Sequence, residues 1–286
     1  QTPDFFLSMM DVPFVTTKAA YEHYENQLRR HILEPLEKVY GVDISDKAIR
    51  AAIGEHNEIC DIISELGELR KLPNPPITSY EFHVLQLVSE CCPQYLIKDK
   101  LLETLKEVRK RKVDPKPNYR ARLVVTGSEV DDPAFTKLLE DCGAYVVADR
   151  YCFGSLPGRE QIELREGESA LDAIARHYLY NNHCPRAMGP KNLKARKQYI
   201  YEKALEYGAE GVIIESMKFC EYWGYERAQD AAWLTEGFAL PGTLPVCQIE
   251  RDYTCAASGQ LRTRFQAFVE SLEIKRIQAA EQKEGA

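Results

Sequence analysis

The sequence of 286 residues has no run of about 18 consecutive apolar residues, which excludes a membrane-spanning helix and a membrane partner. Its first residues lack a basic stretch followed by an apolar one, so we expect no secretory signal there. The net charge of −7, from 37 basic and 44 acidic side chains, makes nucleic acid a poor candidate partner. Neither GxGxxG nor GxxxxGKS/T occurs, so Rossmann and P-loop nucleotide sites are not supported.

No CxxC pair occurs either, although the chain has nine cysteines. A self-contained zinc ribbon or ferredoxin-type cysteine run is therefore excluded. The odd number of cysteines in a long chain argues against a disulfide framework and favours reduced thiols in the cytoplasm. Any metal cluster would have to draw its ligands from cysteines distant in sequence or from outside this chain.

Apolar residues recur at helical spacing in the first part of the chain. They predict four helices, at residues 19–40, 45–69, 79–91 and 95–110. Two proline-rich breaks follow the second and fourth of these helices, and we interpret the later one as a domain boundary. The sequence thus predicts a helical domain at residues 1–116 and a second domain at residues 117–286.

The second domain alternates short, β-branched strands with helices. The strands are expected at residues 122–126, 144–148, 211–215 and 244–249. Continuous apolar strands separated by helices are typical of an α/β fold with a doubly wound parallel sheet covered on both faces. Such sheets carry their sites in the loops at the carboxyl ends of the strands, which here fall at residues 127–132, 149–159, 216–225 and 250–259.

Several side chains in these loops could carry chemistry. Cys220 follows a strand and precedes a helix, where a thiolate would be stabilised by helix N-terminal amides; the alternative is a packed thiol at a turn. Glu129 is a candidate acid or base, beside Ser128 as a candidate substrate contact; the alternative is capping and solvation, which explains Asp132 of the same loop. Gln260 and Arg262 open the last helix and could bind an anion, or form a solvated helix face.

Two further cysteines, Cys152 and Cys255, also lie near expected strand ends. Packing as small apolar side chains is the more common role for thiols in such positions. Cys184 falls in an expected loop beside His183, without a second pair of ligands at the spacing of a zinc site. None of the three is therefore assigned a function from its own position.

Four stretches of the chain, in order, resemble the iron–sulfur family of 2-hydroxyacyl-CoA dehydratases and benzoyl-CoA reductases. They are residues 124–133, 148–154, 207–220 and 259–268. The Lys-Phe-Cys motif that ends at Cys220 and the Gly-Gln-Leu-Arg-Thr-Arg motif that begins at Gly259 are the most specific parts. The resemblance covers nearly the whole chain.

The resemblance implies a fold and a cofactor. Each family subunit has two flavodoxin-like lobes with added helices, and three of its cysteines hold a [4Fe–4S] cluster. Cys220 matches one of these ligands. The other two belong to an earlier lobe, one of them in a Cys-Asp motif, and no cysteine of this sequence matches either. We therefore expect this chain to correspond to the C-terminal part of a subunit and to supply one cluster ligand.

The resemblance also implies low-potential one-electron transfer to an acyl-CoA substrate. The implied partners are a homologous second subunit in a heterodimer and an ATP-dependent iron–sulfur activator protein. Tyr222, Trp223 and Tyr225 lie within five residues after Cys220 and could form a substrate-binding wall that suits an aryl group. This gives a slight preference for benzoyl-CoA reduction, although the same rings could simply pack the lobe.

Two alternatives to this enzyme remain open. A chain without a complete set of cluster ligands could be a cluster-free scaffold or partner subunit that contributes a pocket wall. A flavodoxin-like FMN binder would need a phosphate loop after the first strand. The loop at residues 127–132 is acidic, so it would repel a phosphate.

Overall fold

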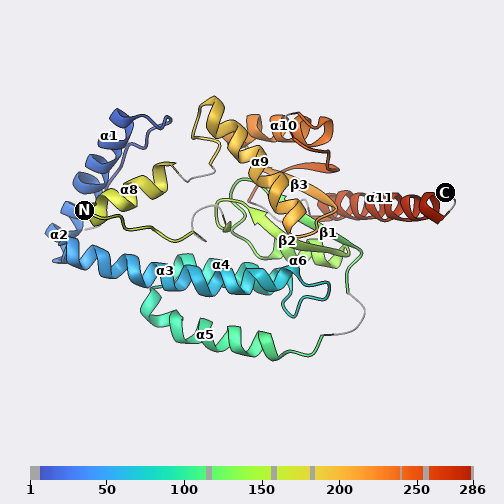
Figure 1. Cartoon of the computed structure of the whole chain (residues 1–286), viewed down its shortest axis with the longest axis horizontal. Coiled ribbons are helices and arrows are strands. Elements are labelled where there is room, and N and C mark those ends of the chain that lie inside the picture. Colours follow the sequence, from blue (N-terminus) through green and yellow to red (C-terminus); the bar gives the residue numbers. More distant parts are fainter. Residues whose placement is uncertain are drawn as a thin grey trace, which may run out of the picture.

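The computed structural model describes residues 7–113, 118–155, 160–180, 184–238, 240–253 and 258–284. Four parallel strands form its sheet, in the order β2-β1-β3-β4 (Figure 1). They are β1 Ala121–Thr126, β2 Ala144–Arg150, β3 Gly211–Met217 and β4 Val246–Arg251. This order follows the flavodoxin-like pattern, and it confirms the predicted α/β class with a parallel sheet.

Helices cover both faces of the sheet. The helices α6 (Ala134–Asp141) and α11 (Ser258–Glu284) enclose one core, in which Phe135 and Phe265 meet edge to face. On the other face, α9 (Pro190–Glu206) and α10 (Glu221–Glu236) enclose a second core. Figure 1 shows α9 and α10 above the strands and α6 below them. Burial on both faces explains why the strands are continuous apolar runs.

A separate layer of helices precedes the sheet in sequence. It contains α1 (Lys18–Leu28), α2 (Glu34–Tyr40), α3 (Asp46–Glu68), α4 (Ser79–Cys91) and α5 (Gln94–Lys110). The four predicted helices are thus confirmed, with one difference: a π-helical turn, Arg29–Leu33, separates α1 from α2. The break falls just before Pro35, which has no N–H to continue the helical ladder. Within the described residues, no helix is both long and apolar enough to span a membrane.

The helical layer also receives a helix from the second half of the chain. This is α8 (Ala170–Tyr180), which packs against α1 and α3 through Ala170, Ala173 and Leu179. Tyr21 of α1 donates a hydrogen bond to the Asp172 carboxylate (2.8 Å). The layer is therefore built from residues on both sides of residue 116.

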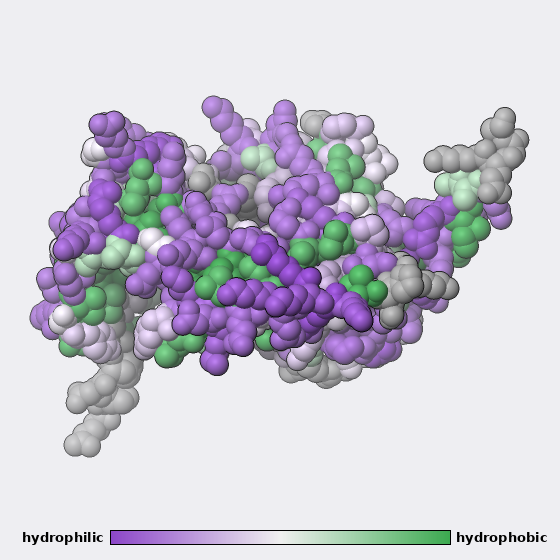
Figure 2. Space-filling view, turned by 60° about the horizontal axis from the view of Figure 1, so that its bottom comes forward, coloured by the Kyte–Doolittle hydropathy of each residue, from purple (hydrophilic) through white to green (hydrophobic). Residues whose placement is uncertain are grey.

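The face of the molecule that Figure 2 shows is mainly polar. In the face shown in Figure 2, hydrophilic side chains predominate and the hydrophobic ones form patches between them. Such scattered apolar residues are ordinary for a folded domain and indicate no site by themselves.

A buried ion pair connects the helical layer to the sheet. Arg70, in the 3₁₀ turn that follows α3, is 1% exposed and pairs with Asp149 of β2 (Nη1 to Oδ2, 3.2 Å). The Arg70 guanidinium also lies over the Phe82 ring of α4, 3.6 Å from its centroid. Asp149 accepts two further hydrogen bonds, from the Ser155 amide (2.7 Å) and from Gln86 (3.3 Å). Both charges are thus compensated away from water, which fixes where β2 lies beneath the helices.

We predict that Arg70→Met destabilises the fold by about 3–5 kcal/mol, because it leaves the Asp149 carboxylate buried without its cation. Urea unfolding followed by circular dichroism measures this change. The control is Arg109→Ala, which removes an exposed ion pair with Glu65 and should cost only about 0–1 kcal/mol. Equal losses in the two variants would contradict a special role for the buried pair.

Candidate functional site

The candidate site is the carboxyl edge of the sheet, where the strand ends carry polar side chains. At its centre is Glu215 of β3, which is fully buried. Its carboxylate accepts hydrogen bonds from the Ser128 amide (2.9 Å) and hydroxyl (2.8 Å), and pairs with Arg251 of β4 (3.0 Å). Burial raises the pKa of Glu215, while Arg251 and Ser128 act in the opposite direction. One carboxylate thus connects the ends of β1, β3 and β4.

The loop after β1 depends on glycine at its first position. A Cβ at Gly127 would lie 2.6 Å from Oε2 of Glu215 and 2.8 Å from its backbone oxygen. Neither atom has room to move, because the Glu215 side chain is bonded on several sides. Glycine is therefore required for the loop to approach β3 so closely.

The structure places the two predicted residues of this loop differently. Ser128 is buried, and its hydroxyl donates to Glu215 while accepting from the Met217 amide (2.6 Å). Glu129 is partly exposed; its carboxylate accepts a hydrogen bond from the Tyr253 hydroxyl and its backbone oxygen accepts one from Arg251. The bond to Glu129 raises the pKa of Tyr253 to about 12. Glu129 is thus partly accessible at this edge, and Asp131 and Asp132 of the same loop are exposed.

Cys220 lies at the same edge, directly before α10. It is the N-cap residue of that helix, is partly exposed, and its amide donates to the Met217 oxygen (3.1 Å). Phe219, just before it, is 100% exposed and has a φ of +68°. Among the residues that the structure describes, Phe219 is the one non-glycine residue with positive φ. A fully exposed aromatic residue in this costly conformation marks the turn that presents Cys220.

Three cysteines from three segments lie near one another here. Cys152 follows β2, Cys184 precedes α9 and Cys220 follows β3. Burial raises the pKa of the Cys152 thiol to about 12, and the nearby Cys184, Glu129 and Cys220 act in the same direction. Trp223 opposes them through a hydrogen bond to the Cys152 thiol. The proximity of Cys184 to the other two could not be inferred from sequence, and Cys255 lies outside the described residues.

Beneath these thiols is a cluster of buried charges. Its cations are Arg150 at the end of β2 and Arg196 and Lys197 of α9, and its anions are Glu226 and Asp230 of α10. The shortest ion pairs are Arg196–Glu226 (2.7 Å) and Lys197–Asp230 (2.7 Å). Burial lowers the pKa of Arg150. Burial and the neighbouring Glu226 raise the pKa of Asp230 to about 6.

This charge cluster has one more basic than acidic side chain, so it favours negative charge at the edge above it. This cluster was not predicted from the sequence, because lysines and arginines on helices usually face solvent. The spacing of Glu226 and Asp230 by one helical turn was the available signal.

The other residues predicted to bind substrate lie in three different places. Trp223 is 2% exposed and lies beneath Arg150, whose guanidinium is 5.1 Å from the Trp223 ring centroid. Tyr222 and Tyr225 are exposed on the neighbouring turn of α10. Gln260 is exposed in the first turn of α11, and Arg262 pairs with Asp141 at the end of α6 (3.6 Å). The structure therefore places Cys220 and Glu129 each near Cys152, and it directs Arg262 to α6.

The cluster expected from the family resemblance needs several ligands. The eight cysteines in the described part of the chain form no disulfide bond with one another. No three His, Cys, Asp or Glu side chains among the described residues are arranged to hold a metal ion. Cys220 is a suitable single ligand, because its thiol is partly exposed at a helix N-terminus, but the described residues do not complete a ligand set around it.

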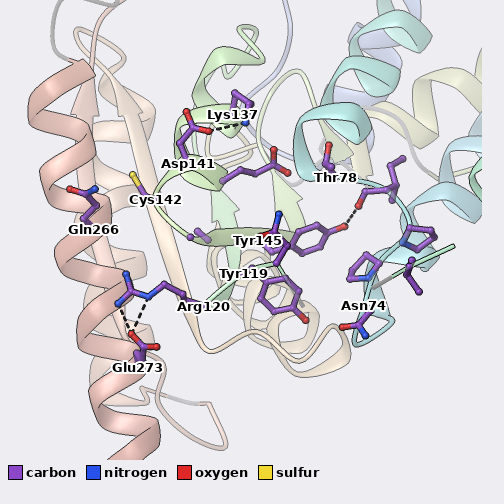
Figure 3. Close-up of a pocket in the computed structure, with 18 of the residues that line it drawn as sticks. Asn74, Thr78, Tyr119, Arg120, Lys137, Asp141, Cys142, Tyr145, Gln266 and Glu273 are labelled. Atoms are coloured by element: carbon purple, nitrogen blue, oxygen red, sulfur yellow. Dashed lines mark hydrogen bonds and ion pairs between the residues drawn. The ribbon is translucent and has the colours of Figure 1, made fainter. Parts of the chain in front are cut away.

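A cavity of about 1000 Å³ lies near the starts of β1 and β2 (Figure 3). Figure 3 shows Tyr119 and Tyr145 between the strands and the segment that precedes α4. Its charged side chains bond to one another: Arg120 donates to Glu273 (3.0 Å), and Lys137 donates to Asp141 (2.8 Å). This cavity is at the amino edge of the sheet, away from the three cysteines.

Comparison with known proteins gives one matching family. The model of the family described as 2-hydroxyglutaryl-CoA dehydratase, D-component, matches residues 4–272. The chain is 27% identical over 255 residues to the (R)-phenyllactyl-CoA dehydratase beta subunit of Clostridium sporogenes, covering 89% of this chain and 65% of that protein. It is 25% identical over 275 residues to the (R)-2-hydroxyglutaryl-CoA dehydratase subunit beta of Acidaminococcus fermentans, covering 91% of this chain and 67% of that one.

A further relative belongs to a reductase. The chain is 23% identical over 225 residues to one of the subunits of the benzoyl-CoA reductase of Thauera aromatica, covering 77% of this chain and 56% of that protein. The chain thus spans between 56% and 67% of the length of these three relatives.

We predict that Cys152 is alkylated by iodoacetamide at least roughly tenfold more slowly at pH 8 than the exposed Cys91, because only the thiolate reacts and its raised pKa keeps Cys152 protonated. The rate at Cys152 should keep rising, about tenfold per pH unit, up to pH 10. Mass spectrometry of the two peptides measures both rates. The unfolded protein is the control, in which they should become similar. Equal rates in the folded protein would disprove the environment assigned to Cys152.

Proposed function

Because the chain belongs to the 2-hydroxyglutaryl-CoA dehydratase D-component family, we propose that it is part of a subunit of an enzyme complex that acts on acyl-CoA thioesters. The observation that carries this proposal is the family match over residues 4–272. The reaction proposed is low-potential electron transfer to the acyl-CoA, of the 2-hydroxyacyl-CoA dehydratase or benzoyl-CoA reductase type. Exposed Tyr222 and Tyr225 beside Cys220 support a slight preference for an aryl substrate.

In this proposal Cys220 is one ligand of a [4Fe–4S] cluster, and the other ligands come from outside this sequence. When bound, such a cluster supplies single electrons at low potential. The charge cluster beneath the edge has one more basic than acidic side chain. It supports this assignment, because an excess positive charge favours a negatively charged group near Cys220. Glu129 is proposed to give or take a proton at the substrate, since its carboxylate reaches the surface.

The proposed partners are a homologous second subunit and an ATP-dependent iron–sulfur activator protein. Two of the relatives are named as beta subunits, which supports an assembly of several chains. The eight cysteines that the described part of the chain keeps as thiols support a reducing compartment, the cytoplasm.

The second candidate is a cluster-free partner subunit of such an assembly, which would contribute a pocket wall and no electron. The observation that favours it is the incomplete ligand set around Cys220 in the described residues. The two candidates differ in one measurable property, the iron content of the full-length protein.

We predict that the full-length protein, purified without oxygen, contains about four iron atoms and four acid-labile sulfides per chain. Cys220→Ser should lower both, because a serine hydroxyl is a poor ligand for iron in such clusters. The control, Cys91→Ser, makes the same chemical change at an exposed thiol of α4 and should leave both unchanged. A protein with no iron would overturn the cluster proposal in favour of the cluster-free candidate.

The preference for aryl substrates is tested with the assembled and activated complex. We predict that benzoyl-CoA is consumed faster than a 2-hydroxyacyl-CoA, because the two exposed tyrosines offer flat apolar surface beside Cys220. Consumption is followed by chromatography of the CoA thioesters. Faster turnover of the 2-hydroxyacyl-CoA would reverse the preference, and turnover of neither would overturn the proposed activity.

A further inference from the structure

A cavity of about 430 Å³ lies between the start of α9 and the N-terminal half of α10, and its lining includes Pro185 and Tyr222, which are close in sequence to Cys184 and Cys220. We propose that this cavity binds the apolar end of the acyl group and selects acyl-CoA substrates by the size of that end, with room for an aryl group. This inference rests on the proposed function. The volume is within the usual range for a small-molecule site, about 300–1,000 Å³.

The walls of this acyl pocket have the chemistry for an apolar ring. Tyr222 and Tyr225 of α10 form one side, and Met188, Pro190 and Leu193 form the other. Tyrosine rings offer faces on which an aromatic group can stack. Methionine and leucine adapt to either an aryl or a branched aliphatic group. The pocket therefore favours an apolar ligand over a charged one.

The base of the acyl pocket is rigid and electrically compensated. Arg196 donates two hydrogen bonds to Glu226 (2.7 and 3.1 Å) and a third to the Ala187 oxygen (2.6 Å). Lys197 adds an ion pair to Glu226 (3.1 Å). Arg196 and Glu226, the two charged residues that line the pocket, are thus paired with each other. The base of the pocket therefore offers no unpaired charge that would attract a charged ligand.

The location of the acyl pocket connects it to the chemistry. Pro185 lines it and directly follows Cys184, and Tyr222 lines it two residues after Cys220. An acyl group held there would have its thioester on the side of the cavity from which the chain leads to Cys184 and Cys220, both of which lie near Cys152. The pocket would thus determine which acyl group reaches Cys220, while Glu129 lies on the neighbouring loop.

The N-terminal segment completes the mouth of the acyl pocket. The ring of Phe14 lies 6.1 Å from that of Tyr222. The Met188 amide donates a hydrogen bond to the Phe14 oxygen (2.8 Å), which ties this segment to the rim. Phe14 remains half-exposed, so it adds apolar surface at the entrance.

The test fills the acyl pocket from its rim. Gln229 is exposed and lines the cavity, so Gln229→Trp adds an indole there without disturbing a core. The full-length protein in its assembled complex, before activation, is titrated with benzoyl-CoA and with the two-carbon acetyl-CoA. We expect Gln229→Trp to weaken benzoyl-CoA binding roughly 10- to 100-fold and acetyl-CoA binding less than about twofold.

A second variant removes a wall instead. Tyr225→Ala deletes a ring that is 75% exposed, so the fold should tolerate it, and benzoyl-CoA should bind roughly tenfold more weakly. The matched control is Tyr95→Ala on α5, which removes a similarly exposed ring elsewhere and should change neither affinity.

The outcomes separate the possible failures. If both thioesters bind the Gln229→Trp and Tyr225→Ala complexes as they bind the wild type, the acyl pocket is overturned. If instead the variants no longer assemble with the partner subunit, the cavity is a protein-docking surface and the proposal is also overturned. A wild-type complex that binds these thioesters size-selectively but turns over no acyl-CoA after activation would overturn the proposed function alone.

Discussion

Buried charges beneath the carboxyl edge of the sheet are the constraint on which the rest of the structure depends. A charge taken out of water costs several kcal/mol unless a partner meets it with good geometry. Asp149 meets Arg70 from the helical layer, and Glu215 meets Arg251 from the neighbouring strand. Each of these pairs joins segments far apart in sequence. The elements cannot separate without leaving a carboxylate buried and uncompensated.

The same constraint shapes the candidate site. Arg196 and Glu226 compensate each other between α9 and α10, and their pairing forms the base of the acyl pocket. Arg150, from the end of β2, adds a third buried cation and covers the Trp223 ring. The electrostatic support of the fold and the surface offered to a ligand are therefore parts of one arrangement. A change in the charge cluster would therefore alter the electrostatic environment of the nearby thiols.

Two kinds of surface meet at this edge. The thiols and Glu129 supply groups that can bind metal or move a proton, and the tyrosines of α10 supply apolar surface. The exposed and strained Phe219 directly precedes Cys220, and the tyrosines follow it in α10. This combination fits a substrate with a reactive polar centre attached to an apolar end, which is the chemical character of an acyl thioester.

The secondary structure and the position of Cys220 could be predicted because they depend on local patterns. Helical periodicity, strand runs and glycine or proline breaks act over a few residues, and the resulting elements differ from the prediction by only a few residues at their ends. The direction in which each side chain points was harder to predict from the sequence. Ser128 and Trp223 turn inward, to Glu215 and Arg150, because the register of β1 and the rotation of α10 are fixed by packing with distant elements.

By itself, the sequence determined the alternation of helices and strands, the class of sheet, and which loops lie at its carboxyl edge. Only the tertiary structure decided that α8 packs with the first helices, that Cys152 and Cys184 approach Cys220, and which charges are buried. The reason is that pairing between distant segments depends on the burial of both partners. A lysine or glutamate in a sequence gives no sign of whether water or an opposite charge will surround it.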